Sequence, residues 1–479
     1  MKFTPLFRRG KTERIDYAFV GGYPTPETVQ QAYDDADLNR AIQAYRFFYP
    51  TVSALAIYKG NEAIGLVPNQ VFGVLDTRPE HVFFTQSADT VYGPMLLDLR
   101  VGPIIVDLPP GPLMGVAMDI YQRWVADMGL TGPDNGNGGA HLFLPPRFTD
   151  EVPTHYEAWG AGSNRVIVGI RSFVVDGDVR GAIERVRAIR ARPFRTKAVW
   201  VEPTWIDLTD RPQDTTPARW EENLEFWARL HEVIDSEPPL EEYLNYYGEL
   251  AALGIAKGSP FDPDRRMREI LEDATQIANA QMRVQAFADR RKERIVWPDR
   301  QWEWVGLRTE NGDFMTPTYT DLDARETWFY QAVGASPALF RRSPGVSPVI
   351  WLSVHDEDGN YLDGSKTYRL AIPQPVPASL LWSITVYDAL TRSEIQTEQR
   401  QAALRSHFEL KDQQAPTLDL YFGPSAPTGA ERRWVKTIPG RGWFAYFRLY
   451  GPLEPIFDRT WKPGDFSPIR QDDGSYVVL

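Results

Sequence analysis

A carboxyl, a phenol and two hydroxyls gather within six residues of this chain, Ser87-Ala88-Asp89-Thr90-Val91-Tyr92, between an aromatic run and an apolar segment. A carboxyl whose pKa is raised by burial can serve as a general acid or base, and a phenol can assist it. The same residue types also satisfy backbone N–H groups in ordinary turns, which is the alternative interpretation. We take Asp89 and Tyr92 as candidate catalytic residues and Thr90 as a candidate ligand contact.

Aromatic and basic residues elsewhere in the chain are candidate walls for a cleft around this cluster. Aromatic faces hold a sugar ring or another flat apolar molecule, and an arginine can neutralise a carboxylate on it. Because ligand pockets favour interfaces, we expect residues near the cluster to face residues from the C-terminal part of the chain. The alternative for each is core packing or a surface ion pair. The predicted ligand-binding residues are Tyr121, Trp124, Arg369, Trp382 and Arg448.

The common catalytic signatures are absent from the sequence. It has no G-x-S-x-G elbow, H-E-x-x-H pair, phosphate loop or dinucleotide fingerprint, and without cysteine it has no thiolate nucleophile or iron–sulfur cluster. We therefore predict no redox or organic cofactor, and chemistry based on carboxylates. Asp119, Asp388 and Glu394 are further acid/base candidates, each with a turn or salt bridge as its alternative.

A polar turn at residues 356–363 contains four acidic residues and invites a calcium assignment. It does not fit the helix-loop-helix template, because Tyr361 occupies the glycine position and Thr367 the position of the closing acid. Binding of a calcium ion by loop carboxylates is kept as an alternative. The glycine-rich segment at 129–146 lacks the context of a phosphate loop and is interpreted as a solvent-exposed turn, with a structural role for His141.

Composition limits the classes of partner. The net charge of −12 opposes nucleic-acid binding and gives no attraction to anionic membranes, and no apolar run is long enough to span a bilayer. The first residues lack the apolar core of a signal peptide. We expect a cytoplasmic protein from the sequence as written, or a periplasmic or secreted one if a signal peptide has been removed. The 15 Trp and 24 Phe favour a homo-oligomer.

The spacing of apolar residues predicts the secondary structure. Residues 22–66 have a helical pattern that begins at Thr25-Pro26 and is interrupted at Pro50. Short apolar runs from 70 to 175 predict strands. Helical stripes follow over 178–191, from the Thr216-Pro217 cap to 234, over 240–254 and over 262–287, and strands return after Trp297.

These patterns predict an α+β fold that is mostly β. An N-terminal helical lead and antiparallel β domain is expected over 1–175, and a helical connecting segment over 176–300. The strands of 301–479 follow one another without helices, which is typical of an antiparallel, jelly-roll-like sandwich.

Several long blocks carry a family resemblance. They include ADTVYGPMLLDL, GLTGPDNGNGGAHLFLPP, YLDGSKTYRLAIP, WSITVYDALTRSEIQT and PGRGWFAYFRLYGPLEPIFDRTWKPGDF. Over about residues 30–470 the chain resembles the bacterial proteins that pair a DUF1254 domain with a DUF1214 domain. The resemblance implies an N-terminal β domain, a helical connection and a C-terminal jelly-roll-like domain, but no catalytic set. Ser87-Ala88 replaces the polar, asparagine-containing lead that is common in relatives, which implies a different ligand if that asparagine takes part in ligand binding.

Three classes of function remain open on the sequence. The first is an enzyme with hydrolase- or lyase-type acid/base chemistry on a small or carbohydrate-like molecule in an interdomain cleft. The second is a non-catalytic protein that binds such a ligand, and the third is a structural assembly protein. Turnover of a substrate panel separates the first from the second.

Overall fold

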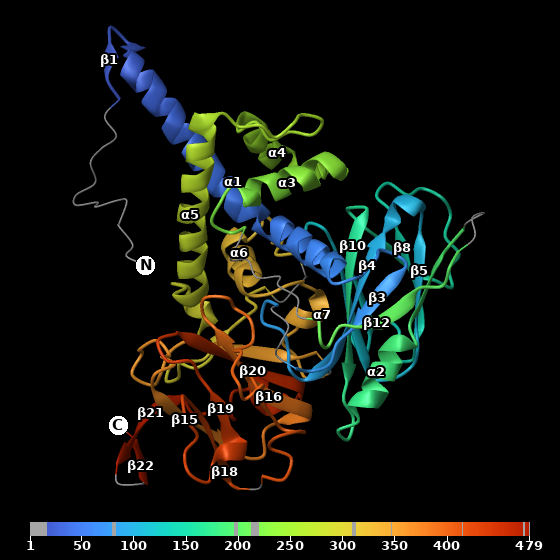
Figure 1. The fold of residues 1–479 in the computed structure, drawn as a ribbon, viewed down its shortest axis with the longest axis vertical. Helices are drawn as coiled ribbons and strands as arrows, with labels where there is room; N and C mark the ends of the chain where they lie inside the picture. Colours follow the sequence, from blue (N-terminus) through green and yellow to red (C-terminus); the bar gives the residue numbers. More distant parts are fainter. Residues whose placement is uncertain are drawn as a thin grey trace.

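A long helix, α1 (Pro26–Ala63), runs through a group of helices and ends beside the N-terminal β part of the molecule (Figure 1). It is seen in a computed structural model that describes residues 17–78, 83–195, 200–211, 220–308, 313–345, 347–413, 415–472 and 475–478. The Thr25 hydroxyl accepts the N–H of Thr28 and caps the helix, as the sequence predicts. The predicted interruption at Pro50 is wrong. The helix continues because Pro50 is buried among packed neighbours, and its carbonyl accepts a hydrogen bond from Gln122 at 3.0 Å.

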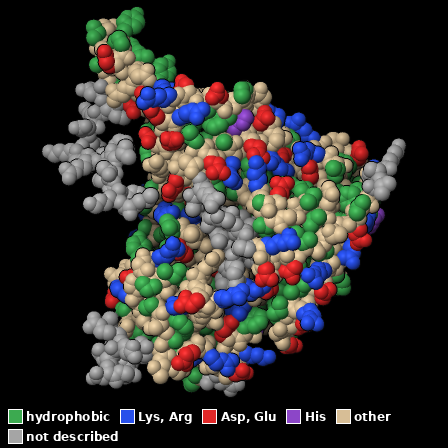
Figure 2. Space-filling view, viewed as in Figure 1, with side chains coloured by type: hydrophobic (Ala, Val, Ile, Leu, Met, Phe, Trp, Pro, Cys, Tyr) green, Lys and Arg blue, Asp and Glu red, His purple; other side chains and the backbone are tan. Residues whose placement is uncertain are grey.

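The start of α1 protrudes from the rest of the chain together with a short hairpin, β1 (Phe19–Val20) and β2 (Tyr23–Pro24). Figure 2 shows hydrophobic side chains at this tip, where Phe19, Val20 and Tyr23 are exposed. Within the ranges that the structure describes, no helix has both the length and the apolar character required to cross a membrane.

Strands fill the N-terminal β part, as predicted. Its two four-stranded sheets are β4 (Thr90–Asp98)–β10 (Arg165–Phe173)–β6 (Leu113–Asp119)–β7 (Trp124–Gly129) and β11 (Arg190–Pro193)–β5 (Ile104–Leu108)–β8 (Gly139–Leu144)–β9 (Glu157–Gly160). A parallel pair, β3 (Val71–Val74) and β12 (Thr204–Asp207), adjoins them. The predicted helix at 178–191 is α2 (Val179–Arg187), which is capped by Asp178 and packs on β4 and β10. The segment expected to be helical also contains two strands, β11 and β12, which follow α2.

Helices from distant segments pack around α1. They are α3 (Glu225–Ser236), α4 (Leu244–Ala252), α5 (Arg265–Phe287) and α6 (Leu322–Gln331). Their aromatic core includes Tyr45, Phe226 and Trp227, with the first two rings stacked at 4.0 Å between centroids. Because α6 belongs to the predicted all-strand segment, the expectation of strands without helices there is wrong. The predicted cap at Thr216-Pro217 lies outside the described residues.

Two five-stranded sheets pack face to face in the C-terminal part. They are β13 (Glu303–Trp304)–β14 (Val349–Ser353)–β20 (Trp443–Pro452)–β16 (Ala378–Asp388)–β17 (Ala403–Arg405) and β19 (Trp434–Lys436)–β18 (Thr417–Gly423)–β15 (Thr367–Pro373)–β21 (Phe466–Asp472)–β22 (Ser475–Val478). Trp351, Trp382 and Trp443 are buried between the two sheets, and the homo-oligomer stays a prediction. The mixed, mostly β fold is confirmed.

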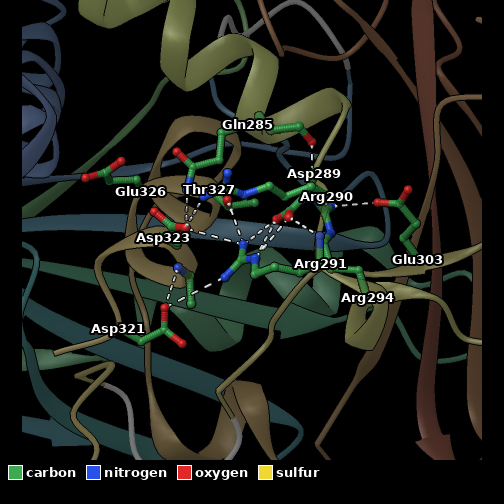
Figure 3. A network of polar contacts seen from close by, with 12 residues as sticks. Gln285, Asp289, Arg290, Arg291, Arg294, Glu303, Asp321, Asp323, Glu326 and Thr327 are labelled. Atoms are coloured by element: carbon green, nitrogen blue, oxygen red, sulfur yellow. Dashed lines mark hydrogen bonds and ion pairs between the residues drawn. The ribbon is translucent and has the colours of Figure 1, made fainter. Parts of the chain in front are cut away.

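A polar network joins the helices to the sandwich (Figure 3). Arg294, 1% exposed, pairs with Asp289 at 3.4 Å and with Glu303 of β13 at 3.1 Å. Arg291 pairs with the same Asp289 and lies 3.8 Å from Asp321, the N-cap of α6. The end of α5, the start of α6 and the first strand of the sandwich are thereby fixed to one another.

A second, fully buried ion pair anchors the loop after β16 in the helical core. The guanidinium of Arg392 pairs with the carboxylate of Glu221 and lies over the rings of Tyr330 and Phe84, 4.0 and 4.8 Å from their centroids. Burial raises the pKa of Glu221, while Arg392 and the Tyr49 phenol oppose that rise. Removing one partner would leave a buried charge without compensation.

We therefore expect Arg392→Met to lower the free energy of unfolding by about 3–5 kcal/mol, the usual cost of breaking a buried pair from one side. Chemical denaturation of the purified protein measures it. The control is Arg265→Met, which breaks the exposed pair with Glu269 and should cost less than about 1 kcal/mol. Equal losses for the two variants would contradict the structural role given to Arg392.

Candidate functional site

A cavity of about 190 Å³ lies between the two β parts. One wall is the sheet β4–β10–β6–β7, and the opposite wall comes from β14, β20, α6 and the short helix α7 (Pro337–Phe340). The end of α1 and the segment 83–87 complete the lining. Most of the surface is apolar, with contributions from Phe83, Phe84, Met118, Ile167, Trp328 and Ile350.

The register of the sheet explains which side chains form its cavity face. Arg171 of β10 is paired with Tyr92 on one side and Met114 on the other. Side chains on one face of a strand recur every second residue, so the neighbouring row on this face lies two residues along. From β4 to β7 that row consists of Pro94, Gly169, Val116 and Asp127. At Gly169 an added Cβ would meet no atom nearer than 3.9 Å, so this glycine leaves open space on the cavity floor.

Arg171 places a guanidinium at one end of this floor. Its Nε donates to the Thr90 hydroxyl at 3.1 Å, its Nη2 donates to the Tyr450 phenol at 2.5 Å, and the group lies over the ring of Tyr92. Among the described residues, no carboxylate oxygen lies within 4.0 Å of it. Burial opposes the charge, but the Tyr450 and Tyr92 phenols outweigh burial and raise the guanidinium pKa. Arg171 is a permanent cation without an ion-pair partner in that part of the chain.

Arg448 of β20 brings a second cation to the cavity. It is 4% exposed and donates to the Thr85 carbonyl at 2.6 Å, the Tyr387 phenol at 2.5 Å and the Thr385 hydroxyl at 3.3 Å. It too has no carboxylate within ion-pair distance in the described ranges. One half-buried cation, Arg171, and one buried cation, Arg448, therefore line one cavity, and neutral oxygens accept hydrogen bonds from both.

A chain of hydrogen bonds connects Arg171 to the carboxylate of Asp89. Arg171 donates to the Tyr450 phenol, whose oxygen is 3.0 Å from the Ser87 hydroxyl. Ser87 donates to Asp89 Oδ2 at 2.9 Å, and the Ser383 hydroxyl donates to the same oxygen at 2.8 Å. Because the Ser87 proton is directed to Asp89, the Tyr450 proton must point to Ser87. The hydrogen bonds from Arg171 to Tyr450 and from Tyr450 to Ser87 each join one β part to the other. Only the bond from Ser87 to Asp89 stays within one part.

The segment 83–87 is held in a strained conformation by residues of the C-terminal part. Thr85 has a φ of 39°, which is uncommon for a β-branched residue. Its N–H donates to the Arg392 carbonyl at 2.8 Å, its hydroxyl donates to the Gln331 carbonyl at 2.8 Å, and its own carbonyl accepts from Arg448. The strain is sustained because the surrounding structure fixes every polar group of this residue.

Asp127 of β7 places a carboxyl in the same cavity. Burial raises its pKa to about 6, although the Ser336 hydroxyl and the Ala338 N–H, at 3.4 Å, lower it. Such a carboxyl changes protonation near neutral pH and suits acid/base work. Asp127 and Arg171 were not among the sequence candidates, because both lie within apolar strand-like runs. The sequence feature that could have identified them is a charged residue inside an apolar strand, where charges are disfavoured. Asp127 lies in VADMG and Arg171 in VIVGIRSFVV.

The structure brings together only some of the predicted site residues. Tyr92 and Arg448 line the cavity. Asp89 and Thr90 are 0% exposed and lie behind the wall, where they contact Ser87 and Arg171. The site predicted around Asp89 thus lies beside the cavity, and the catalytic role of Asp89 stays a prediction.

The other four predicted ligand-binding residues lie away from the cavity, which corrects their expected placement. The Tyr121 phenol donates to the Pro238 carbonyl in the helical core, and Trp124 packs against Trp159. Trp382 is buried inside the sandwich, 5.7 Å from Phe447 between ring centroids. Arg369 faces outward on β15, 3.8 Å from Asp419. Sequence spacing shows which residues share a strand face but not what packs on that face.

The remaining acidic candidates have structural contacts. Asp119 accepts the N–H groups of Tyr121 and Arg123, and burial raises its pKa to about 6. Asp388 caps the turn after β16 and pairs with Arg441 at 2.6 Å. Glu394 is buried beside β16, where its backbone pairs with Tyr387.

The polar turn considered for calcium is organised by one side chain. Asp356 is 0% exposed, and its Oδ1 accepts the N–H groups of Asp358 and Asn360. This is the capping role that Asp commonly has in turns. In the described part of the chain, no three His, Asp or Glu side chains are grouped closely enough to hold a metal ion. Calcium binding stays a prediction without a site in those ranges.

Comparison with solved structures supports the fold through one of them. The VPA0106 protein from Vibrio parahaemolyticus matches with a TM-score of 0.55 at 16% identity, over 91% of this chain and 100% of that one. An uncharacterised protein from Burkholderia cenocepacia gives a TM-score of 0.41 at 12% identity, over 92% and 97% of the two chains. No curated protein matches. At these identities the first structure supports the fold alone.

Two protein-family profiles match separate segments. One is described as "Protein of unknown function (DUF1254)" and matches residues 69–193, and the other, "Protein of unknown function (DUF1214)", matches 348–454. The first segment supplies the sheet floor of the cavity, and the second supplies β14 and β20 of the opposite wall. The chain belongs to the proteins that combine a DUF1254 domain with a DUF1214 domain.

Proposed function

We propose that the cavity binds a small organic anion with an apolar body. The observation that carries the proposal is the pair of cations, Arg171 and Arg448, on an otherwise apolar lining without carboxylate partners among the described residues. Buried arginines normally pair with carboxylates, since removing an ion from water costs several kcal/mol. A ligand carboxylate would supply the missing charge through charge-assisted hydrogen bonds.

The balance of charge at this end of the cavity favours a single anionic group. Asp89 is linked to Arg171 by hydrogen bonds through Ser87 and Tyr450, and its charge raises the pKa of Arg448 after the phenols of Tyr387 and Tyr450. Burial lowers the pKa of Arg448 and so opposes this effect. One carboxylate against two guanidinium groups leaves one positive charge, which a monoanionic ligand head would neutralise.

The walls favour an apolar ligand body over the carbohydrate-like ligand expected from the sequence. A sugar presents hydroxyls on all sides and needs many polar contacts, whereas this lining includes Phe83, Phe84, Met118 and Ile167. An aromatic or aliphatic acid would bury its body against these groups at about 25 cal/mol per Å² of apolar surface.

Acid/base catalysis is the second candidate function, and Asp127 favours it. Its carboxyl, with a pKa of about 6, lies in the same cavity as the two cations. In this proposal Asp127 exchanges a proton with the bound anion, and Asp89 is a positioning residue that holds Ser87. Turnover of a bound acid, rising with pH through about 6 and lost in Asp127→Asn, distinguishes catalysis from binding alone.

We expect Arg171→Gln to weaken binding of small carboxylates about 10- to 100-fold, because a hydrogen bond to a charged group is worth roughly 1.5–3 kcal/mol. Titration calorimetry with benzoate and hexanoate, each compared with its neutral amide, measures the effect. The amides should bind weakly to wild type and lose little in the variant. Arg369→Gln, on the outer sheet, is the control and should bind as wild type. Equal affinity for acids and amides would refute anion recognition.

We expect Gly169→Val to abolish binding without lowering stability. The new side chain would occupy the open floor between Arg171 and Asp127, and valine suits a strand interior better than glycine. The control is Gly160→Val on β9, where an added Cβ also meets nothing within 4 Å but lies outside the cavity. Thermal unfolding and the same titrations report both properties. Undiminished binding by a folded Gly169→Val protein would place the ligand elsewhere.

A further inference from the structure

Asp127 lies at the far side of the cavity floor from the cations. It is on β7, the edge strand of the sheet, two strands and two residues away from Arg171. From the usual strand spacing and rise, their Cα atoms are about 12 Å apart. The sheet face between them carries Met114, Gly169 and Val116, and none has a charged or hydrogen-bonding side chain. The floor is therefore cationic at one end, apolar in the middle and acidic at the other end.

The Asp127 carboxylate has unused capacity to accept hydrogen bonds. It is 7% exposed, and its Oδ2 accepts from the Ala338 N–H only at 3.4 Å, while the Ser336 hydroxyl is its other partner. Within the described ranges no Lys, Arg or His nitrogen lies within 4.0 Å of it. An ionised carboxylate offers about four acceptor positions, so at least one is free to serve a group in the cavity.

We infer that the ligand carries a hydrogen-bond donor at the end remote from its anionic head, and that Asp127 accepts this hydrogen bond. The inference rests on the proposed anion site and narrows its ligand to a bifunctional acid: an apolar chain or ring with a carboxylate at one end and a hydroxyl or ammonium at the other. Arg171 and Arg448 bind the carboxylate, Gly169 leaves room for the body, and Asp127 selects the far end.

The raised pKa of Asp127 agrees with such a role. Burial makes ionisation costly when the cavity holds no donor, and Arg341 offsets that cost only weakly. A bound hydroxyl or ammonium would stabilise the ionised form. The donor end of the ligand would thus give the Asp127 carboxylate a hydrogen bond that neither the folded chain nor bulk water supplies fully.

The experiment compares unbranched acids from butanoate to octanoate with their ω-hydroxy and ω-amino counterparts by titration calorimetry. In wild type we expect the best ω-substituted acid to bind about 10- to 100-fold more tightly than the plain acid of the same length, the value of a hydrogen bond to a charged group. In Asp127→Ala this preference should disappear, while the plain acid retains its affinity within about twofold. Whether the hydroxyl or the amino series gains more identifies the donor.

Two further variants make the result decisive. Asp127→Asn keeps the shape of the side chain and removes its charge, so it should lose the ammonium preference even if the alanine variant folds poorly. Asp107→Ala removes a strand carboxylate outside the cavity and should leave every affinity unchanged. Equal binding of plain and substituted acids by wild type would overturn this inference and leave the anion site standing. Absence of binding by every acid would overturn both.

Discussion

Two guanidinium ions, the buried Arg448 and the half-buried Arg171, lie where the β parts of this chain meet, and the rest of the site depends on how the protein tolerates them. In the described residues neither has a carboxylate within 4.0 Å, so phenols, hydroxyls and one carbonyl stabilise the charge instead. Such neutral partners compensate an ion less fully than a carboxylate does. The two cations therefore give the apolar cavity a positive electrostatic potential, and an anion that entered it from water would be stabilised by that potential.

The same contacts hold the two β parts together. Arg448, Tyr450 and Ser383 come from the sandwich, whereas Ser87 and Asp89 come from the segment that leads into β4. The strained Thr85 is fixed by backbone and side-chain groups of Arg392, Gln331 and Arg448. Each β part supplies one wall of the cavity, so the cavity forms only where the two parts are in contact.

Much of the fold follows from sequence patterns, because periodicity reports directly on burial. The capped start of α1, the strands of the N-terminal part and the α2 helix were predicted in this way. Pro50 was misjudged since tertiary packing outweighs the local cost of proline. The helix α6 was missed because its polar and apolar residues are buried alike, so its sequence shows no apolar stripe at helical spacing.

The site was predictable only in part. Tyr92 and Arg448 were identified from a hydroxyl-rich turn and a family block, and both reach the cavity. Arg171 and Asp127 carry much of the proposed chemistry, yet each is one charged residue within an apolar strand. Only the register, which aligns Arg171 with Tyr92 and Asp127 with Val116, shows that they share a face.

The most direct test of the central claim is a crystal structure of the protein grown with a bromine-labelled acid, such as 4-bromobenzoate. The account predicts an anomalous bromine peak inside the cavity, with the carboxylate within hydrogen-bond distance of Arg171 and Arg448 and the ring over Gly169. A well-ordered cavity without bromine at saturating ligand, or a carboxylate bound away from both arginines, would contradict it.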